Sequence, residues 1–509
     1  MDKDTGKAFD LRLFKRLLHR TRPYRLTFYG VAFAAILLSG FAVMTPIILQ
    51  QIIDDAIKAG NSELLLYLVL AMLGVLLGQV VSQLGFNYYA NWLGESVIKD
   101  VRVDLFRHML GFRMKYFDSS SLGVLVTRAV ADMQRIGEIF SQGFFQIVAD
   151  LLKMIVAAGV MLYMNWKLAL IVFVLLPIIV YATRQFQKAM KVAFTEVRAE
   201  VANLNSFVQE RITGMKIVQL FTREKIESDK FRDINKKHQD AWLKTVWYNS
   251  IFFPIAEIVS SIAVGLIVWY GGLLNVTNLA REEFGTIFAF ILLIDMLFRP
   301  LRQIADKFNT LQMGMVAANR VFRILDTDSN IQDVGTIEKE KVRGDISFKN
   351  VRFGYVEDEE VLHGISFEVK AGETIAIVGA TGAGKSTIIN LLGRFYEIDS
   401  GCIEVDGVDI KDFKLNSLRD HIAVVLQDVF LFADTIANNI SLKDPSIDLD
   451  TIEEAARQIL VDEFITSLPG GYEYNVKERG SMLSSGQRQL IAFLRAYVSN
   501  PSILVLDEA

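Results

Sequence analysis

At 509 residues the chain is too long for one compact domain, so two or more domains are expected. The composition is 52% hydrophobic and 22% charged, which indicates an apolar part joined to a polar one. The formal net charge of −4 gives a nucleic-acid partner no electrostatic support, and the single cysteine, Cys402, excludes an intramolecular disulfide framework.

The N-terminal region is basic and runs straight into a long apolar segment instead of a short one with a cleavage site. We therefore expect no cleavable signal peptide. Within this region, residues 9–22 place Leu13, Phe14, Leu17 and Leu18 on one face and basic residues on the other. The pattern predicts an amphipathic helix along the inner membrane surface, although a soluble helix would have a similar pattern.

Long apolar segments dominate the part of the chain that follows. A helix needs roughly 20 apolar residues to cross the hydrocarbon core of a bilayer. One such segment could be a buried helix of a soluble protein, but six of them predict six membrane spans. They lie at about 26–53, 64–93, 139–164, 166–183, 249–275 and 284–308.

The connections between these segments alternate between short and long. The two long ones, at about 94–138 and 184–248, are polar and helix-forming. Together with the N-terminal stretch they carry most of the Lys and Arg of this half, which places them in the cytoplasm. Six spans then put both ends of this half on the cytoplasmic side.

The character of the chain changes after the last apolar segment. Residues 326–344 are polar and indicate a linker. A strand alternating through Ile365, Phe367 and Val369 leads to a continuous apolar strand, "TIAIV", then a glycine loop and a helix. The later runs "IAVVL" and "ILVL" are typical of strands buried on both faces between helices.

These patterns predict a membrane domain of six helices, residues 1–330, followed by an α/β P-loop nucleotide-binding domain, residues 331–509. The glycine loop "GATGAGKST" matches the G-x-x-x-x-G-K-[ST] phosphate loop, whose backbone N–H groups bind phosphates at a helix N-terminus. Lys385 should reach the β- and γ-phosphates, and Ser386 should hold Mg²⁺. We assign the nucleotide contacts of this loop to Gly379, Thr381, Gly382, Ala383, Gly384, Lys385, Ser386 and Thr387.

A second nucleotide element is the run "ILVLDE" near the end of the chain. It has the form of a buried strand that ends at the metal, so Asp507 would serve Mg²⁺ directly or through water. Glu508 would orient or deprotonate the attacking water. An isolated acidic strand end could also be a helix cap or a surface pair, but here a phosphate loop precedes it.

Between these elements lies "LSSGQ", residues 483–487, which resembles the signature of ATP-binding cassette transporters. In that family the signature of one subunit closes over ATP held by the phosphate loop of the other. The resemblance implies that Ser484, Gly486 and Gln487 contact nucleotide across a dimer, with ATP and Mg²⁺ as cofactors.

Other positions resemble the same family one at a time. Tyr355 in "FGY" resembles the aromatic residue that stacks on adenine, and a surface tyrosine is the alternative. Gln427 in "VVLQDVFLF" resembles the glutamine that touches Mg²⁺ and begins a loop facing the membrane half. The segments 116–136 and 212–224 are similar to the two coupling segments of exporter-type members, and 298–326 to the helix that enters the cassette.

The resemblance implies half of a dimeric exporter in the bacterial plasma membrane, with its nucleotide-binding domain in the cytoplasm. ATP would drive export of a hydrophobic or amphipathic substrate, a drug or a lipid, and the partners would be a second subunit and the bilayer, without nucleic acid. Two alternatives are a non-transporting channel or regulator on the same scaffold, and an inactive fragment.

The chain departs from the family pattern in two places. Ser485 stands where glycine is usual, as in one subunit of heterodimeric exporters, so a different partner chain is favoured slightly over a homodimer. No histidine follows Glu508, and the sequence stops at Ala509. We therefore expect residues 1–509 to be a truncated cassette that neither folds stably nor hydrolyses ATP, and we expect the ATPase activity in the full-length parent.

Ionisable residues also occur inside the predicted spans. Asp150 and Lys153 are three residues apart, and Asp295 and Arg299 are four apart, so each pair can interact on one helix face. Glu257 lies in the fifth span, and Pro300 predicts a kink in the sixth. Such groups either neutralise one another or line a water-filled cavity.

Overall fold

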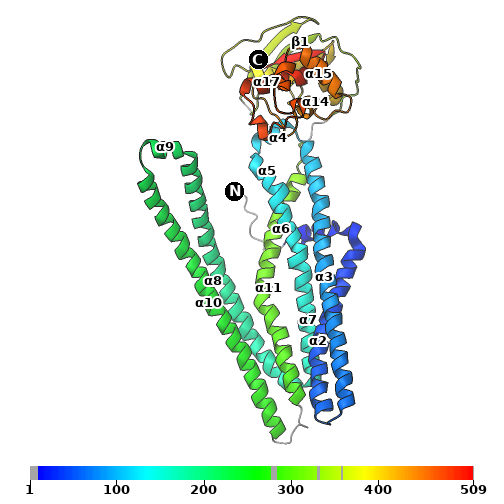
Figure 1. Ribbon diagram of the computed structural model, residues 1–509, viewed down its shortest axis with the longest axis vertical. Coiled ribbons are helices and arrows are strands. Elements are labelled where there is room, and N and C mark those ends of the chain that lie inside the picture. Colours follow the sequence, from blue (N-terminus) through cyan, green and yellow to red (C-terminus); the bar gives the residue numbers. More distant parts are fainter. Residues whose placement is uncertain (1–9, 277–283, 330–332, 357–358, 508–509) are drawn as a thin grey trace. The chain divides into compact units, whose positions relative to one another are not determined.

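The computed structural model describes residues 10–276, 284–329, 333–356 and 359–507 (Figure 1). Glu508 and Ala509 therefore lie outside the described residues. The chain forms two compact units: residues 1–107 with 123–327, and residues 108–122 with 328–509. The predicted division at residue 330 places the segment 108–122 in the membrane domain. In the structure this segment groups with the second unit.

The first unit is all-helical, and the prediction of six spans is confirmed. Six described helices or helical stretches are long and apolar enough to cross a membrane. The main helices are α2 (Arg25–Gln51), α3 (Ser62–Leu110), α7 (Phe145–Met164), α8 (Trp166–Thr213), α10 (Glu224–Val276) and α11 (Phe284–Leu325).

Three of these helices extend far beyond a bilayer. α3, α8 and α10 have 49, 48 and 53 residues. At about 1.5 Å per residue they are roughly 72–80 Å long, against a hydrocarbon core of about 30 Å. Much of the two long polar connections therefore consists of helical extensions of the spans.

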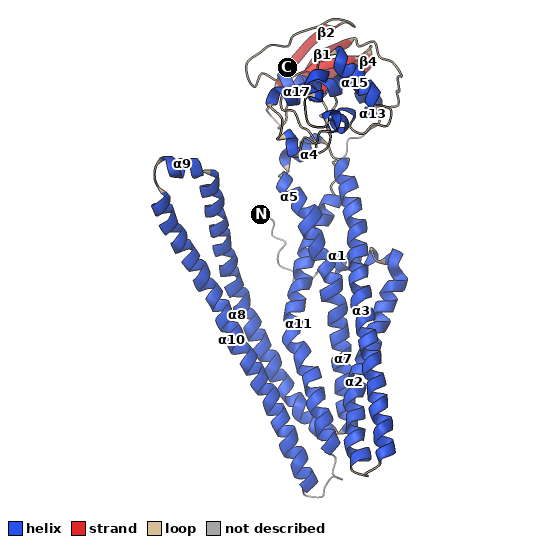
Figure 2. Ribbon diagram, viewed as in Figure 1, coloured by secondary structure: helices blue, strands red, loops and turns tan. Residues whose placement is uncertain are grey.

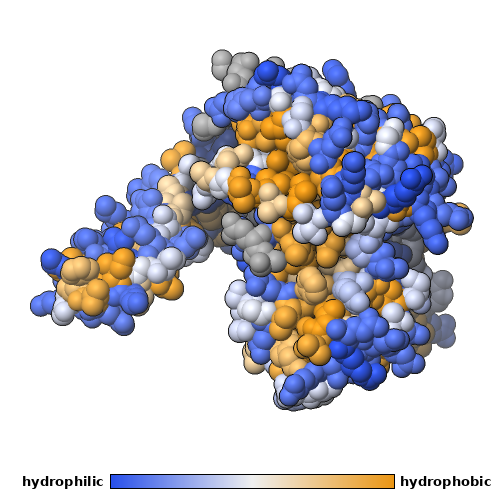
Figure 3. All heavy atoms as spheres, turned by 90° about the horizontal axis from the view of Figure 1, so that it is seen from above, coloured by the Kyte–Doolittle hydropathy of each residue, from blue (hydrophilic) through white to orange (hydrophobic). Residues whose placement is uncertain are grey.

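Short elements connect the long helices. The chain from α3 to α7 runs through α4 (Met114–Ser119), α5 (Leu122–Thr127) and α6 (Met133–Glu138), with π-helical turns at Arg128–Asp132 and Ile139–Phe144. α9 (Met215–Leu220) closes the hairpin of α8 and α10. Ile217, Leu220 and Phe221 are exposed at this tip, and the end of the hairpin carries orange, hydrophobic atoms on the left of Figure 3.

The core of the first unit lies where α7, α8, α10 and α11 meet. Phe290, Leu293 and Phe298 of α11 are fully buried and pack against Ala169 and Val172 of α8 and their neighbours. α11 continues as a helix through Pro300. Buried apolar side chains on several helices hold this bundle together by close packing, since lipid supplies little hydrophobic drive between spans.

The amphipathic N-terminal helix is present as α1 (Leu11–His19), but protein covers its apolar face. Phe14 and Leu17 are buried, and the ring of Phe14 lies 5.3 Å from that of Phe144. Arg16 forms two 2.6 Å hydrogen bonds with Asp326 near the end of α11. Phe14 and Leu17 therefore pack within the protein, and the position of α1 along the inner membrane surface stays a prediction.

The second unit contains two separate sheets (Figure 2). The first is antiparallel in the order β2-β1-β3-β4, formed by β1 (Ile346–Phe353), β2 (Leu362–Val369), β3 (Ser400–Val405) and β4 (Val408–Asp409). The second pairs β5 (Ile422–Val425) with β6 (Ile503–Leu506) in parallel, so that Val425 lies opposite Leu506.

Helices surround these sheets and complete the unit. Buried side chains from β1, β3 and α12, among them Phe348, Ile403 and Leu391, form one core, and a second core gathers around α14, α15 and α17. The helices are α12 (Lys385–Leu392), α13 (Leu415–Asp420), α14 (Ile436–Ser441), α15 (Leu449–Gln458), α16 (Asp462–Thr466) and α17 (Ser485–Val498).

The prediction that "TIAIV" forms a buried strand is wrong for this structure. Residues 374–378 have no regular secondary structure, and Ile375, Ile377 and Val378 are exposed. The two sheets formed by the described residues contain no strand that pairs with this run. Apolar composition alone does not make a strand, because the backbone N–H and C=O groups also need a hydrogen-bonding neighbour.

The C-terminal end of α2 and the N-terminal end of α11 meet at a close backbone contact. A π-helical turn, Ile52–Ile57, follows α2, and Asp54 Oδ1 accepts a 2.7 Å hydrogen bond from the backbone N–H of Gly285. Gln50 also donates to Thr286 Oγ1 at 3.0 Å. A Cβ on Gly285 would lie 2.5 Å from the backbone oxygen of Gln50, so only glycine fits.

We therefore expect Gly285→Ala to destabilise the first unit by about 1–3 kcal/mol, the usual range for overpacking. The measurement is the thermal unfolding midpoint in detergent. Gly272→Ala is the matched control, because nothing lies within 4 Å of its added Cβ and alanine favours a helix. An unchanged midpoint for Gly285→Ala would contradict the close contact.

Candidate functional site

The predicted phosphate loop lies exposed at the start of α12. Gly384 caps this helix with a φ of +87°, a conformation that side chains other than glycine rarely adopt. The Lys385 ammonium donates to the backbone oxygens of Gly379 and Ala380, at 2.9 and 3.1 Å. The lysine thus folds back over the loop, and the loop residues 379–383 are open to solvent.

The structure brings two predicted metal ligands together. Ser386 Oγ lies 3.4 Å from Asp507 Oδ1, although the two residues are far apart in sequence. Asp507 is held there because its backbone N–H donates to Val425 O at 2.9 Å, which continues the pairing of β5 and β6. Hydroxyl and carboxylate oxygens are ligands that Mg²⁺ prefers, so this donor set fits the ion.

Of the other two predicted catalytic residues, the structure describes Gln427 but not Glu508. Gln427 is exposed two residues beyond the end of β5, the strand that also positions Asp507. Glu508 lies outside the described residues, so its role stays a prediction.

Tyr355 lies beside the phosphate-loop helix. Its hydroxyl is 3.2 Å from Thr387 Oγ1, and its half-buried ring meets those of Phe353 and Tyr396 edge-on. The role of Tyr355 in stacking on adenine stays a prediction. Tyr396 in turn donates to the carboxylate of Asp118, which belongs to the segment 108–122.

The hydrogen bond between Tyr396 and Asp118 was not expected from the sequence. Burial and the hydrogen bond to Asp118 raise the pKa of the Tyr396 hydroxyl, so it stays protonated and acts as a donor. Asp118 lies in the segment that resembles a coupling segment, but nothing in the local pattern around Tyr396 identified it as the partner. The contact connects that segment to the side chains around the phosphate loop.

The signature residues form a capped helix start. Ser484 Oγ accepts from the Gln487 backbone N–H at 3.2 Å, and Gln487 Oε1 accepts from the Ser484 backbone N–H at 2.8 Å. Ser485 and Gly486 are exposed in the first turn of α17. Among the described residues no hydrogen bond connects Ser484, Gly486 or Gln487 with the phosphate loop.

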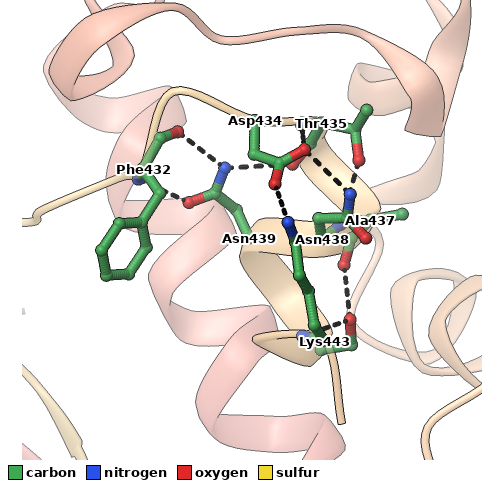
Figure 4. Close-up of polar contacts among 8 residues, drawn as sticks. Phe432, Asp434, Thr435, Ala437, Asn438, Asn439 and Lys443 are labelled. Atoms are coloured by element: carbon green, nitrogen blue, oxygen red, sulfur yellow. Dashed lines mark hydrogen bonds and ion pairs between the residues drawn. The ribbon is translucent and has the colours of Figure 1, made fainter. Parts of the chain in front are cut away.

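The loop after Gln427 is fixed by a buried asparagine (Figure 4). Asn439 is fully buried, and its amide donates to Phe432 O and Thr435 O at 3.0 Å while accepting from Phe432 N at 2.8 Å. Arg495 of α17 donates to Asn439 O at 2.8 Å and to Phe430 O at 3.4 Å. The loop is therefore tied to the same helix that carries the signature.

Asp434 stabilises the start of α14 in the same region. Its carboxylate accepts from Asn438 and pairs with Lys443, both at 2.8 Å. These interactions, led by the one with Lys443, lower the pKa of Asp434 to about 2. Neither this cluster nor Asn439 was singled out from the sequence, because no short motif marks either of them.

The charged residues of the spans pair differently from the expectation. Asp150 pairs with Lys307, and Arg302 pairs with Glu257 at 3.0 Å and with Asp295 at 3.6 Å. The expected pairs within one helix are wrong, because side chains from neighbouring helices and turns reach the carboxylates instead.

Two cations are left over by this arrangement. Among the described side chains, Lys153 and Arg299 have no carboxylate within 4 Å. Lys153 is half-buried, Arg299 is exposed on α11, and the two are close enough to interact electrostatically.

We expect Asn439→Asp to destabilise the second unit by about 2–4 kcal/mol, because a buried carboxylate would face the carbonyls of Phe432 and Thr435. Chemical denaturation followed by the second unit's signal measures this loss. Asn416→Asp, an exposed change in α13, is the control and should leave the midpoint unchanged. Equal midpoints for the two variants would show that the buried amide is unimportant.

Both halves of the chain match known protein families. Residues 28–301 match the ABC transporter transmembrane region, and residues 362–509 match the ABC transporter family. The chain is 34% identical to an uncharacterized ABC transporter ATP-binding protein of Bacillus subtilis, over 100% of this chain and 84% of the relative.

Two further relatives have more informative names. A putative multidrug export ATP-binding/permease protein of Bacillus subtilis is 30% identical over 98% of this chain and 87% of its own length. An ATP-dependent lipid A-core flippase of Yersinia pestis is 33% identical over 97% of this chain and 85% of its own length.

Proposed function

The chain belongs to the ABC transporter family, and on that premise we propose that it exports an anionic amphiphile whose headgroup binds Lys153 and Arg299. It is a half-transporter that couples ATP hydrolysis to export of a drug or lipid. It is a multi-pass membrane protein that works in a dimer. What we propose beyond this is the chemical class of the substrate, an anionic amphiphile.

The proposal rests on two cations, Lys153 and Arg299, that form no ion pair within 4 Å among the described side chains, although Asp150 and Asp295 attract Lys153 at longer range. Ionisable groups in a span are rare and usually pair or face a water-filled cavity. Asp150, Glu257 and Asp295 are all engaged by Lys307 or Arg302, which leaves Lys153 and Arg299 to attract an anion. The surrounding spans are apolar, so a molecule with a charged headgroup and a hydrophobic tail suits the site.

A relative supports the same class of substrate. The lipid A-core flippase is named for a lipid, and it is similar to this chain over nearly the whole length. The multidrug export protein is the competing precedent. We favour a lipid-like anion because Lys153 and Arg299 form no ion pair within 4 Å among the described side chains and can attract an acidic headgroup.

We also propose roles for the nucleotide site. Lys385 would leave the carbonyls of Gly379 and Ala380 to bind the phosphates of ATP, and Glu508 would orient the attacking water. Mg²⁺ would be held by Ser386, Gln427 and Asp507 and would offset the negative charge on the β- and γ-phosphates.

The second subunit would complete this site with its own signature. In the same way Ser484, Gly486 and Gln487 would contact ATP on the partner. Ser484 and Gly486 are exposed at the start of α17, and Gln487 is partly exposed. We propose a different partner chain, with the transmembrane and nucleotide-binding domains dividing near residue 330. We place the protein in a bacterial plasma membrane, its nucleotide-binding domain in the cytoplasm.

The substrate proposal is tested with a matched pair of amphiphiles. Lysophosphatidic acid should stimulate ATPase activity in phosphatidylcholine vesicles, whereas monoacylglycerol of the same chain length should not. The double variant Lys153→Gln/Arg299→Gln should raise the half-stimulating concentration at least about 100-fold, since each of the two charged hydrogen bonds contributes about 1.5–3 kcal/mol.

Lys167→Gln is the control for this experiment, because Lys167 is an exposed cation at the start of α8. Its half-stimulating concentration should equal that of the wild type. Equal stimulation by the charged and neutral amphiphiles, or an unaffected double variant, would rule out the anion site while leaving the exporter assignment intact.

Ser485→Gly tests the identity of the partner. In a heterodimer this signature would face the weaker site, so the substitution should change turnover by less than about twofold. In a homodimer the same change touches both sites and should alter turnover clearly. ATPase assays of the protein with and without a candidate second subunit make the measurement, and full activity of the chain alone would contradict the heterodimer.

A further inference from the structure

A strip of basic residues runs along the outward face of α1. Arg12, Lys15, Arg16, His19 and Arg20 line a shallow hollow of about 510 Å³. Arg16 is held by Asp326, and Arg20 is held by Asp104 at 2.6 Å. These two ion pairs fix the helix in place.

The other three basic residues of this strip form no ion pair among the described side chains and can bind an anion. Arg12, Lys15 and His19 are exposed, and their spacing of three and four residues places them on one helix face. None of the three has a carboxylate partner within 4 Å among the described side chains. Because Phe14 and Leu17 are buried in the protein, this part of α1 presents charge rather than apolar surface.

The neighbouring residues indicate the depth of α1 relative to the membrane. Tyr24 follows α1, and its ring meets that of Trp92 edge-on at 5.5 Å. Trp92, Tyr88 and Tyr89 are exposed on α3, as expected for an aromatic belt at the level of the lipid headgroups. Leu26 is 90% exposed at the start of α2, where the lipid-facing apolar surface begins.

We propose that Arg12, Lys15 and His19 bind the phosphate of an anionic glycerophospholipid in the inner leaflet. Cations at the inner surface are attracted to anionic lipids, and the arginine fork suits phosphate oxygens. This site is separate from Lys153 and Arg299 and does not depend on the exported substrate.

The site has a consequence for the rest of the first unit. Arg16 lies within the same helix turn as Arg12 and Lys15 and is fixed to Asp326 beyond the end of α11. Its guanidinium also lies 4.2 Å from the ring centre of Phe322. A bound lipid headgroup would therefore steady the junction between α1 and the end of α11.

The test uses spin-labelled phosphatidylglycerol and the intact protein in phosphatidylcholine nanodiscs. We expect the triple variant Arg12→Gln/Lys15→Gln/His19→Gln to weaken the binding of the labelled lipid about 30-fold, which corresponds to about 1 kcal/mol for each of Arg12 and Lys15. The triple variant Lys225→Gln/Lys236→Gln/Lys237→Gln removes exposed charge from α10 and should bind as the wild type does.

Two further measurements make the result decisive. The unfolding midpoint of the first triple variant should match the wild type, because all three side chains are exposed. Glycerol 3-phosphate at millimolar concentration should not displace the labelled lipid. Equal binding by both triple variants, or displacement by glycerol 3-phosphate, would overturn the lipid site.

Discussion

The parallel pairing of β5 with β6 is the interaction on which the nucleotide site depends. The backbone hydrogen bond from Asp507 to Val425 continues this pairing past the end of β6. It sets the Asp507 carboxylate 3.4 Å from the Ser386 hydroxyl at the start of α12. Two segments separated by more than a hundred residues thereby supply one set of oxygen ligands. The same strand, β5, leads directly to Gln427 and the loop after it.

Two hydrogen-bonded connections extend outward from this centre. Asn439 and Arg495 join the loop after Gln427 to α17, whose first turn carries the signature. Tyr355 and Tyr396 lead from Thr387 to Asp118 in the segment 108–122. Packed side chains therefore connect the loop after Gln427 with the signature helix, and Thr387 with a segment that resembles a coupling segment. In the membrane half, the pairing of three carboxylates by Lys307 and Arg302 leaves the two cations that define the proposed substrate site.

Local patterns in the sequence predicted much of this arrangement. The length of the apolar segments predicted six spans, and "GATGAGKST" predicted a glycine loop followed by a helix, which is α12. Contacts between distant segments could not be predicted in this way. The partners of Asp150 and Asp295 lie on other turns or helices, and Asn439 depends on an arginine 56 residues away. The apolar run at 374–378 failed as a strand for the same reason, since pairing is a property of its neighbours.

We propose that ATP hydrolysis at the site containing Lys385, Ser386 and Asp507 drives movement of an anionic amphiphile. The most direct measurement follows fluorescent lysophosphatidic acid across proteoliposome membranes, comparing the wild type with Glu508→Gln at saturating ATP. We expect ATP-dependent movement by the wild type. In the variant we expect movement at least about 10²-fold slower, with ATP binding retained, because a general base is lost. Equal movement by the two proteins, or movement that does not need ATP, would show that hydrolysis at this site does not drive export.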